Sequence, residues 1–500
     1  MGFARNGLGW SIVCVLPVFL VVVENLDAQQ PALAITNVNV IDVAAGVVQP
    51  DRTILIAEGR IIGVASGSNA ALPDGIERVQ GAGLYVMPGL LDMHAHVPSF
   101  VGLARRVLPL FVANGVTGIR EMSSDSWRKS PLSNQIEAMK SLATRIEDGE
   151  LIGPRILQTS TGAVHGPVRI RPNTSPQKSA HPFYPPKTEA DGRSIARYAK
   201  EHGIDFVKVY ESVPRNVYFA LLDEARKLGV EVNGHLPKAI GLLEASAAGQ
   251  RTVEHARALP LACSAVAEEY RQAVDAFLAG QTPWSDAARL HSHLSDVLAT
   301  YDGDLAQTVL HTLKKNETYL VPTHITRRMD AMAADSDYRD DPRLSYMHGI
   351  LRANWKKDAD RMAELGKTAP FVEFYKHGLR LTGLAHKAGV KIMMGTDATD
   401  TYCFPGFGAH DELGELVKAG LSPLDALRSA TIVPAEYLGM QANVGTVTKG
   451  AFADLVILEK NPLEDIAHTQ AIRAVVIRGK HLDRAALDEM LESLESKRPK

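Results

Sequence analysis

Apolar and polar residues alternate along short runs at both ends of the chain, with turn residues between the runs. Runs of this kind occur at residues 33–43, 52–65, 83–89, 445–462 and 471–480. A period of two is typical of half-buried β-strands, and the Ala-Glu-Gly-Arg sequence at 57–60 predicts a hairpin turn. We therefore expect a small composite β-sandwich domain, formed by residues 31–87 together with residues 443–482.

The middle of the chain alternates short apolar runs with helix-like stretches. Eight of these runs have the length and β-branched content of buried strands, at 89–96, 115–122, 155–161, 205–210, 230–236, 251–256, 318–324 and 391–398. Helix-like stretches between them, such as 194–203 and 218–229, end in glycine, as helices commonly do. This alternation predicts an α/β fold, a parallel (β/α)8 TIM barrel over residues 88–442. A doubly wound open sheet is the alternative.

Two intervals are longer than a simple crossover between barrel strands, at residues 257–315 and 326–385. Both are rich in helix formers and in charge. Insertions after barrel strands lie above the face where active sites form, so we interpret both as helical lids over the barrel mouth. Solvated decoration or a contact between subunits of a homo-oligomer is the alternative. Residues 483–500 are expected to form a C-terminal tail.

The N-terminal 28 residues have the pattern of an export signal. Arg5 precedes an apolar core at 8–23, and a polar stretch follows with a cleavage position after Ala28. An uncleaved membrane anchor is the alternative, but the core is short for a span of about 20 residues and Pro17 interrupts it. We expect a signal peptide, an exported protein that is periplasmic or secreted, and no stable membrane insertion after cleavage.

Composition bears on the size of the core, on binding to nucleic acid and on the use of disulfide bonds. With 45% hydrophobic residues among 500, the chain can bury a large core. A net charge of only −3 offers no basic field for nucleic acid. Cys14 lies in the leader, so the mature chain keeps Cys263 and Cys403. A disulfide between them is one reading, but two buried free thiols are expected.

Polar residues of few types stand at the ends of the predicted barrel strands. They are His94 and His96 on the first strand, Lys208 on the fourth, His235 on the fifth, His255 on the sixth and Asp397 on the eighth. Each alone has a simple structural explanation, such as a hydrogen-bonded core histidine or a helix cap. Six such residues at equivalent strand ends favour one shared site.

Imidazole and carboxylate groups together suit zinc or a similar divalent ion. A buried lysine does not bind a cation while it is an ammonium group. Burial lowers the pKa of its amine, and the neutral amine reacts with carbon dioxide to give a carbamate with two oxygen donors. Lys208 is therefore the most informative member of the set.

The chain resembles metal-dependent hydrolases of the amidohydrolase superfamily, in the branch with binuclear imidazolonepropionase-like and prolidase-like enzymes. The resemblance covers nearly the whole mature chain. It rests on Val-Met-Pro-Gly-Leu-Leu-Asp-Met-His-Ala-His-Val at 86–97, Val-Lys-Val-Tyr at 207–210, Asn-Gly-His-Leu-Pro at 233–237, Val-Glu-His-Ala at 253–256, Met-Met-Gly-Thr-Asp-Ala at 393–398, and the closing segment at 445–463.

The resemblance implies the role of each ligand. His94, His96 and Asp397 hold one divalent metal, expected to be zinc. His235 and His255 hold a second, and Lys208, as N6-carboxylysine, bridges both. A hydroxide between the metals is the implied nucleophile, and Asp397 takes its proton and passes it to the leaving amine.

Other residues near the barrel mouth are secondary candidates. Tyr210 shares a strand face with Lys208, so it is expected to donate to the developing oxyanion, with a packed aromatic as the alternative. Arg120 and Glu121 end the second strand and are expected to contact the ligands from outside. Substrate-binding roles are expected for His165, His324 and His410, although His410 is equally suited to capping its helix.

The leading function is cleavage of an amide C–N bond in a small-molecule or peptide substrate. Dipeptides, Xaa-Pro-type peptides, N-acyl amino acids and toxin amides such as ochratoxin are the candidate substrates. A lactonase or phosphotriesterase is the alternative enzyme, because hydroxide attack suits carbonyl and phosphoryl centres alike. A deaminase is disfavoured because no glutamate follows the strand histidines at the usual place. A secreted non-catalytic binding protein is the alternative of another class, although none of the six ligands is missing.

Overall fold

The computed structural model describes residues 1–2, 32–67, 72, 75–127, 133–167, 181–283 and 290–495. The leader expected at 1–28 therefore lies outside the described residues except for its first two, and so do the last five residues of the expected tail. In the part of the chain that is described, no helix is both long and apolar enough to cross a membrane.

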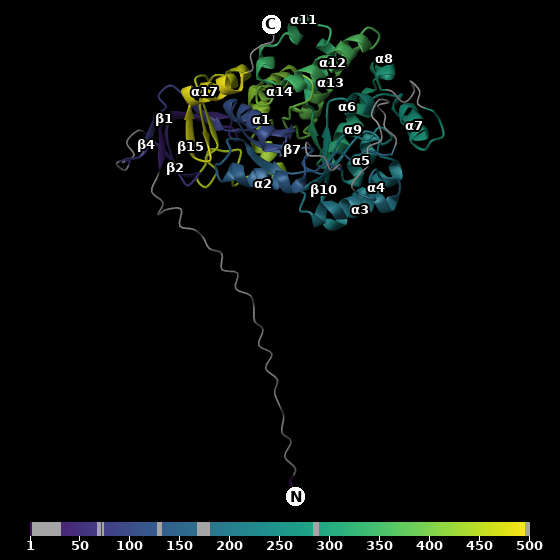
Figure 1. Cartoon of the computed structure of the whole chain (residues 1–500), viewed down its shortest axis with the longest axis horizontal. Coiled ribbons are helices and arrows are strands. Elements are labelled where there is room, and N and C mark those ends of the chain that lie inside the picture. Colours follow the sequence, from purple (N-terminus) through teal and green to yellow (C-terminus); the bar gives the residue numbers. More distant parts are fainter. Residues whose placement is uncertain are drawn as a thin grey trace.

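Strands from both ends of the chain form one eight-stranded sheet, at one end of the molecule in Figure 1. The order is β15-β14-β13-β5-β1-β2-β3, and β4 pairs with β1. Met87 of β5 lies opposite Val456 of β13, so the two chain ends meet within the sheet. The strands are β1 (Leu33–Asp42), β2 (Val47–Ala57), β3 (Arg60–Ser66), β4 (Glu77–Gln80), β5 (Tyr85–Pro88), β13 (Leu455–Leu458), β14 (Ile472–Ile477) and β15 (Lys480–Asp483).

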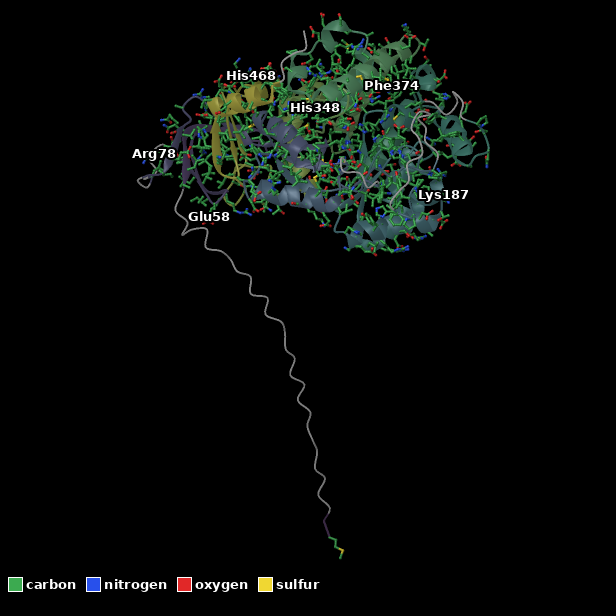
Figure 2. All side chains as sticks on the ribbon, in the orientation of Figure 1. Glu58, Arg78, Lys187, His348, Phe374 and His468 are labelled. Carbon is green, nitrogen blue, oxygen red and sulfur yellow. The ribbon has the colours of Figure 1, made fainter. Side chains whose placement is uncertain are left out.

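Strands β2 and β3 form the hairpin that the sequence predicted. Ala57 pairs with Arg60, and the two residues between them, Glu58 and Gly59, have φ of 50° and 74°. A two-residue turn with positive φ at both positions matches the right-handed twist of the strands that it joins. Glu58 is exposed at the turn (Figure 2).

Seven parallel strands form the centre of the molecule. They pair as β6-β7-β8, β9-β10 and β11-β12. All but β8 and the first residue of β10 are buried along their whole length, as expected for parallel strands covered by helices. The strands are β6 (Leu90–Ala95), β7 (Val116–Glu121), β8 (Arg155–Gln158), β9 (Phe206–Val209), β10 (Glu231–Gly234), β11 (Thr252–Glu254) and β12 (Tyr319–Val321).

Isolated β-bridges and single backbone hydrogen bonds connect these three sheets into a TIM-barrel-like arrangement. Ser160 pairs with Phe206 between β8 and β9, and the amide of Arg251 donates to the carbonyl of Val232 between β10 and β11, at 3.0 Å. Segment 391–398 lies between β12 and β6, because Ile392 pairs with Leu320 of β12 and Ala398 pairs with Ala95 of β6.

Segment 391–398 is not the regular eighth strand that the sequence predicted. The amides of Thr396 and Asp397 both donate to the carbonyl of His94, and Asp397 has a left-handed backbone with φ of 58°. A regular ladder of β-sheet hydrogen bonds cannot continue through a residue with this backbone conformation. A Cβ atom at Gly395 would lie 2.8 Å from the Cβ of His94, so only glycine permits this close approach.

Helices separate the parallel strands and cover them from outside (Figure 1). Between β6 and β11 they are α1 (Val101–Ala113), α2 (Ile136–Glu147), α3 (Glu189–Glu201), α4 (Arg215–Leu228) and α5 (Leu242–Ala248). After segment 391–398 come α14 (Phe407–Lys418), α15 (Pro423–Ser429), α16 (Ile432–Leu438), the 3₁₀ turn η5 (Ile466–Gln470) and α17 (Arg484–Leu494).

The two long intervals are helical, as predicted. The first holds α6 (Ala258–Ala262), α7 (Ala267–Leu278), η3 (Leu290–His293), α8 (Leu294–Ala299) and α9 (Gly303–Lys315). The second holds α10 (His324–Met332), α11 (Ser336–Arg339), η4 (Pro342–Tyr346), α12 (Gly349–Leu365) and α13 (Phe371–Ala388).

The two insertions pack against each other and against the chain that follows Asp397. One apolar cluster contains Tyr270 of α7, Phe374 of α13 (Figure 2) and Phe404. The indole of Trp355 on α12 donates to the carbonyl of Thr399 at 3.2 Å. These contacts place part of the second insertion directly over the loop after the barrel segment 391–398.

Both cysteines of the described chain are buried free thiols, as expected from the sequence. Burial raises the pKa of the Cys263 thiol to about 12, so this group stays protonated and packs as a small apolar side chain.

Candidate metal centre

The six residues singled out at the strand ends converge in one place. We call them the six-residue cluster: His94, His96, Lys208, His235, His255 and Asp397. All six side chains are buried except that of His96, which is 28% exposed. Strand period places His94 and His96 on one side of β6, and the parallel neighbours bring the other members to the same edge.

One half of the cluster is formed by His94, His96, Asp397 and Lys208. Oδ1 of Asp397 lies 3.2 Å from Nε2 of His94 and 3.1 Å from Nε2 of His96. Nζ of Lys208 lies 3.4 Å from each of the same two nitrogens. Around a tetrahedral zinc ion with bonds of about 2.1 Å, neighbouring ligand atoms are about 3.4 Å apart. The spacing of these atoms therefore fits a divalent ion.

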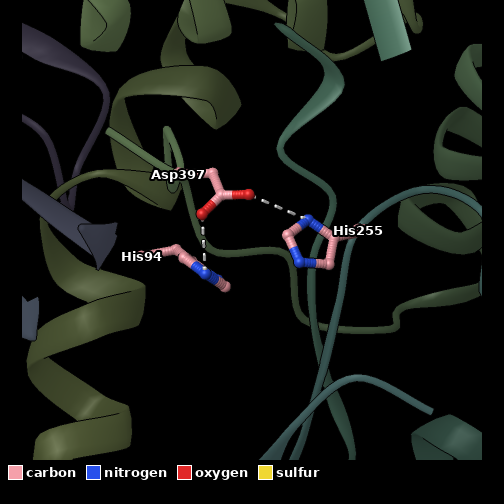
Figure 3. A group of neighbouring side chains, drawn as sticks. All are labelled: His94, His255 and Asp397. Carbon is pink, nitrogen blue, oxygen red and sulfur yellow. Dashed lines mark ion pairs between the residues drawn. The ribbon is translucent and has the colours of Figure 1, made fainter. Parts of the chain in front are cut away.

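The other half is formed by His235 and His255, whose Nε2 atoms are 2.9 Å apart. Asp397 connects the two halves, because its Oδ2 atom lies 3.7 Å from Nδ1 of His255. Figure 3 shows Asp397 with one oxygen directed at His94 and the other at His255. Ligand atoms of these three residues all lie within 4.8 Å of one another, which is close enough to share metal ions.

The protonation states of the cluster members other than His94 suit metal binding, since ligands must be deprotonated. Burial alone would lower the pKa of His94, but the neighbouring Asp397 raises it. Burial lowers the pKa of His235 to about 3 and that of His96 to about 4, so both imidazoles are neutral near pH 7. Burial also lowers the pKa of Lys208. Burial alone would raise the pKa of Asp397, but the adjacent imidazoles hold it well below its ordinary value.

A buried carboxylate orients His94 from behind. Oε2 of Glu254 lies 2.8 Å from Nδ1 of His94, and its Oε1 accepts from Arg120 at 2.7 Å. Arg120 is completely buried and also donates to the carbonyl of Met93. Arg120 therefore contacts His94 indirectly, through Glu254, a residue that the sequence reasoning missed. Glu254 could have been identified by its position next to His255 on a short, buried strand.

Two more carboxylates hold the backbone around the first strand. Asp92 accepts from the amides of His94 and Thr396 at 3.1 and 3.0 Å, which ties β6 to segment 391–398. Glu121 accepts from the amide of Val97 at 3.3 Å. Burial raises the pKa of Glu121 to about 7. Glu121 was expected to contact the ligands from outside, but this contact is to the backbone directly after His96.

Tyr210 and His165 lie beside the second half of the cluster. The ring centroids of Tyr210 and His235 are 4.0 Å apart, and those of His165 and Tyr210 are 4.3 Å apart. The structure therefore brings both predicted residues to one edge of the cluster.

His324 and His410 are placed differently from the expectation of a substrate contact. Nε2 of His324 lies 3.0 Å from the hydroxyl of Thr382 on α13, and the side chain is completely buried. Both ring nitrogens of His410 are engaged, by Thr469 at 2.9 Å and by the carbonyl of Asn114 at 3.0 Å. These contacts favour packing roles, because they join both rings to neighbouring helices and loops.

A charged group that the sequence reasoning missed lies next to His235. Arg257 approaches Nδ1 of His235 at 3.3 Å and pairs with Glu211 at 2.8 Å, and Glu211 also pairs with Lys238 at 2.9 Å. Each follows a member of the six-residue cluster by two or three positions. These residues line a small cavity of about 30 Å³ together with apolar side chains such as that of Leu261.

Parallel strands with metal-binding residue types at their carboxyl ends define the class of barrel enzymes whose active sites form on that face. Within this class, the chain belongs to the amidohydrolase family, whose model matches residues 85–482. This membership confirms the resemblance found in the sequence. The solved structures of relatives share its fold.

Individual relatives are similar over different extents. The chain is 41% identical to ochratoxinase from Aspergillus niger over 93 residues, which is only 18% of either chain. Bottromycin amidohydrolase has the same fold, with a TM-score of 0.68, 22% identity and coverage of 95% of this chain and 93% of the other. A Xaa-Pro dipeptidase matches with a TM-score of 0.62, 20% identity and coverage of 90% and 99%.

Proposed function

We propose that this chain is an exported, binuclear metal-dependent amidohydrolase that cleaves an amide C–N bond in a small substrate. The observation that carries the proposal is the convergence of four imidazoles, a buried amine and a carboxylate at separations of 2.9–3.7 Å. A buried cluster of this kind, with two neutral imidazoles and an ionised carboxylate, is suited to holding a cation.

His94, His96 and Asp397 are proposed to hold one metal, and His235 and His255 a second, with zinc as the expected ion. Lys208 is proposed to bridge them as N6-carboxylysine. Its amine is buried and its pKa is lowered, so the neutral form adds to carbon dioxide and releases one proton. When bound, such metals lower the pKa of a water molecule and polarise a carbonyl group.

The chain's own residues then orient the substrate and move the proton. Asp397 is ionised and reaches both halves of the cluster, so its carboxylate is placed to accept a proton and to return it to the leaving amine. Tyr210, packed against His235, is proposed to donate a hydrogen bond to the developing oxyanion. His165 is proposed to contact the substrate beside it.

The candidate substrates are dipeptides, Xaa-Pro-type peptides, N-acyl amino acids and toxin amides. The similarity to ochratoxinase and to a Xaa-Pro dipeptidase supports this range. Lactones and phosphotriesters suit the same cluster chemically, so they belong in the same screen. Cleavage of lactones or triesters alone would overturn the amide assignment.

The decisive experiment measures metal content and hydrolysis together. We expect about two equivalents of divalent metal per chain, and loss of amide hydrolysis with a chelator or in Lys208→Ala. Lys356→Ala is the matched control, because that lysine is 71% exposed and pairs with Asp360 of the same helix. A metal-free chain that binds small molecules with full affinity would instead establish the non-catalytic binding protein.

Export and domain organisation complete the proposal. Removal of residues 1–28 is supported by the order of Arg5, apolar core and small residue, and N-terminal sequencing of the exported protein tests it. The proposed domains are 31–87 with 443–482, and 88–442 with its two insertions. Light scattering of the mature chain tests the proposed homo-oligomer.

A further inference from the structure

A threonine two residues after the end of β12 contacts His255 on the side away from His235. Oγ1 of Thr323 lies 2.7 Å from Nδ1 of His255, and both side chains are buried. The opposite ring nitrogen of His255, Nε2, faces Nε2 of His235 at 2.9 Å. A histidine can present a lone pair to a metal at one nitrogen only when its proton is held at the other.

The surrounding hydroxyls indicate the direction of this hydrogen bond. The hydroxyl of Thr326 donates to the carbonyl of Thr323 at 2.8 Å, which leaves its oxygen as an acceptor 3.5 Å from Oγ1 of Thr323. Thr323 can therefore direct its hydrogen at Thr326 and accept from Nδ1–H of His255. This arrangement leaves Nε2 of His255 with a free lone pair directed at His235.

Thr323 reaches this position through an unfavourable backbone conformation. Its φ is 44° and its ψ is 53°, in the left-handed region. A β-branched residue is rarely found there, because its side chain collides with the backbone. Glycine or asparagine would occupy this position with less strain.

Glu412 on α14 holds the turn from the opposite side. Its two carboxyl oxygens accept from the amides of His324 and Ile325, at 2.8 and 2.9 Å, and the side chain is completely buried. These amides are the first two of α10, which have no partner within the helix. The contact fixes the residues directly after Thr323 and so opposes relaxation of its backbone.

We propose that Thr323 is a positioning residue for His255. Its hydroxyl fixes the tautomer and ring orientation of that imidazole, and Glu412 maintains the strained turn from which the hydroxyl acts. The inference rests on the proposed metal-dependent function, since it assigns His255 its lone pair toward the metal held with His235.

The test compares a substitution that removes the hydroxyl group with one that keeps it. Thr323→Val keeps the volume and the β-branch but removes the hydroxyl, whereas Thr323→Ser keeps the hydroxyl. Zinc affinity is measured by competition with a chromophoric chelator, and the visible spectrum is recorded after loading with cobalt. In Thr323→Val we expect zinc to bind the site of His235 and His255 about 10–100-fold less tightly, and the cobalt spectrum to change. In Thr323→Ser we expect the zinc affinity and the cobalt spectrum of the wild type.

Thr323→Gly separates positioning from folding, because glycine accepts the left-handed backbone without strain. We expect a melting temperature equal to or above that of the wild type, together with the weakened zinc binding of Thr323→Val. Zinc binding as tight as that of the wild type in Thr323→Val or Thr323→Gly overturns the inference while the proposed function stands. A wild-type chain that binds no zinc overturns the proposed function itself.

Discussion

Nδ1 of His94 lies 2.8 Å from Oε2 of Glu254, and both side chains are completely inaccessible to solvent. The carboxylate is itself paired with the guanidinium of Arg120. His94 is thus held by two further buried groups in series, the carboxylate of Glu254 and the guanidinium of Arg120. A metal ligand with such support keeps one tautomer and one ring orientation.

Glu254→Gln should weaken metal binding and reduce stability at the same time. The neutral amide is a poorer acceptor from His94, and the charge of Arg120 loses its buried partner. We expect metal affinity to fall about 10–100-fold and the free energy of unfolding to fall by about 3–5 kcal/mol. Chelator competition and denaturant unfolding measure the two effects. Glu137→Gln, at a side chain that is 78% exposed, is the control and should change neither.

Arg257→Met should move the loss of metal to higher pH. The positive charge of Arg257 is one cause of the low pKa of His235, next to burial, while Glu211 acts in the opposite direction. Without Arg257 the pKa of His235 rises from about 3, so protons compete with the metal at a higher pH. A titration of bound metal between pH 3 and 7 is the measurement. An unchanged midpoint, equal to that of the exposed control Arg226→Met, contradicts the expectation.

Reconstitution with metal should depend on dissolved carbon dioxide. The lowered pKa of Lys208 makes its amine available to form a carbamate. We expect apoprotein loaded with zinc in degassed buffer to recover amide hydrolysis slowly, and added bicarbonate to accelerate the recovery several-fold. Mass spectrometry of the native holoprotein should show one added carbon dioxide, absent from Lys208→Ala. Equal recovery with and without bicarbonate excludes the modification.

The stability of the fold should decrease as the pH rises from 4.5 to about 8, because of Glu412. Burial raises the pKa of this carboxyl group from 4.5 to about 8. Between these two values the folded state binds a proton that the unfolded state has lost. The resulting stabilisation is full below pH 4.5 and disappears as the pH rises through 8. Denaturant unfolding at pH 6 and pH 9 should show a larger decrease in the wild type than in Glu412→Gln, and equal decreases would contradict the assignment.

Much of the candidate site was predictable because strand geometry is regular. A period of two directs His94 and His96 to the same side, and parallel neighbours bring Lys208, His235 and His255 to the same edge. Asp397 was expected at the end of an eighth strand, and it joins the cluster although its segment is not a regular strand. Local regularity therefore sufficed for residues whose positions follow from strand ends.

The sequence reasoning was less informative where a role depends on contacts between distant segments. His410 stands thirteen residues after Asp397 and seemed suited to substrate binding, but its ring bonds to Thr469 and Asn114. Neither partner is near it in the chain. Glu254 and Arg257 adjoin His255, yet their roles depend on which distant side chains they meet.

The sequence by itself determined the alternation of strands and helices, the composite sheet strands and the six residues that converge, because these follow from short-range periodicity and residue type. Only the tertiary structure decided the orientation of each imidazole. Those orientations depend on Glu254, Thr323 and Arg257, which are brought to the cluster by packing of separate elements. A single hydrogen bond across such a contact selects the tautomer, and no pattern along the chain encodes which pair of atoms meets.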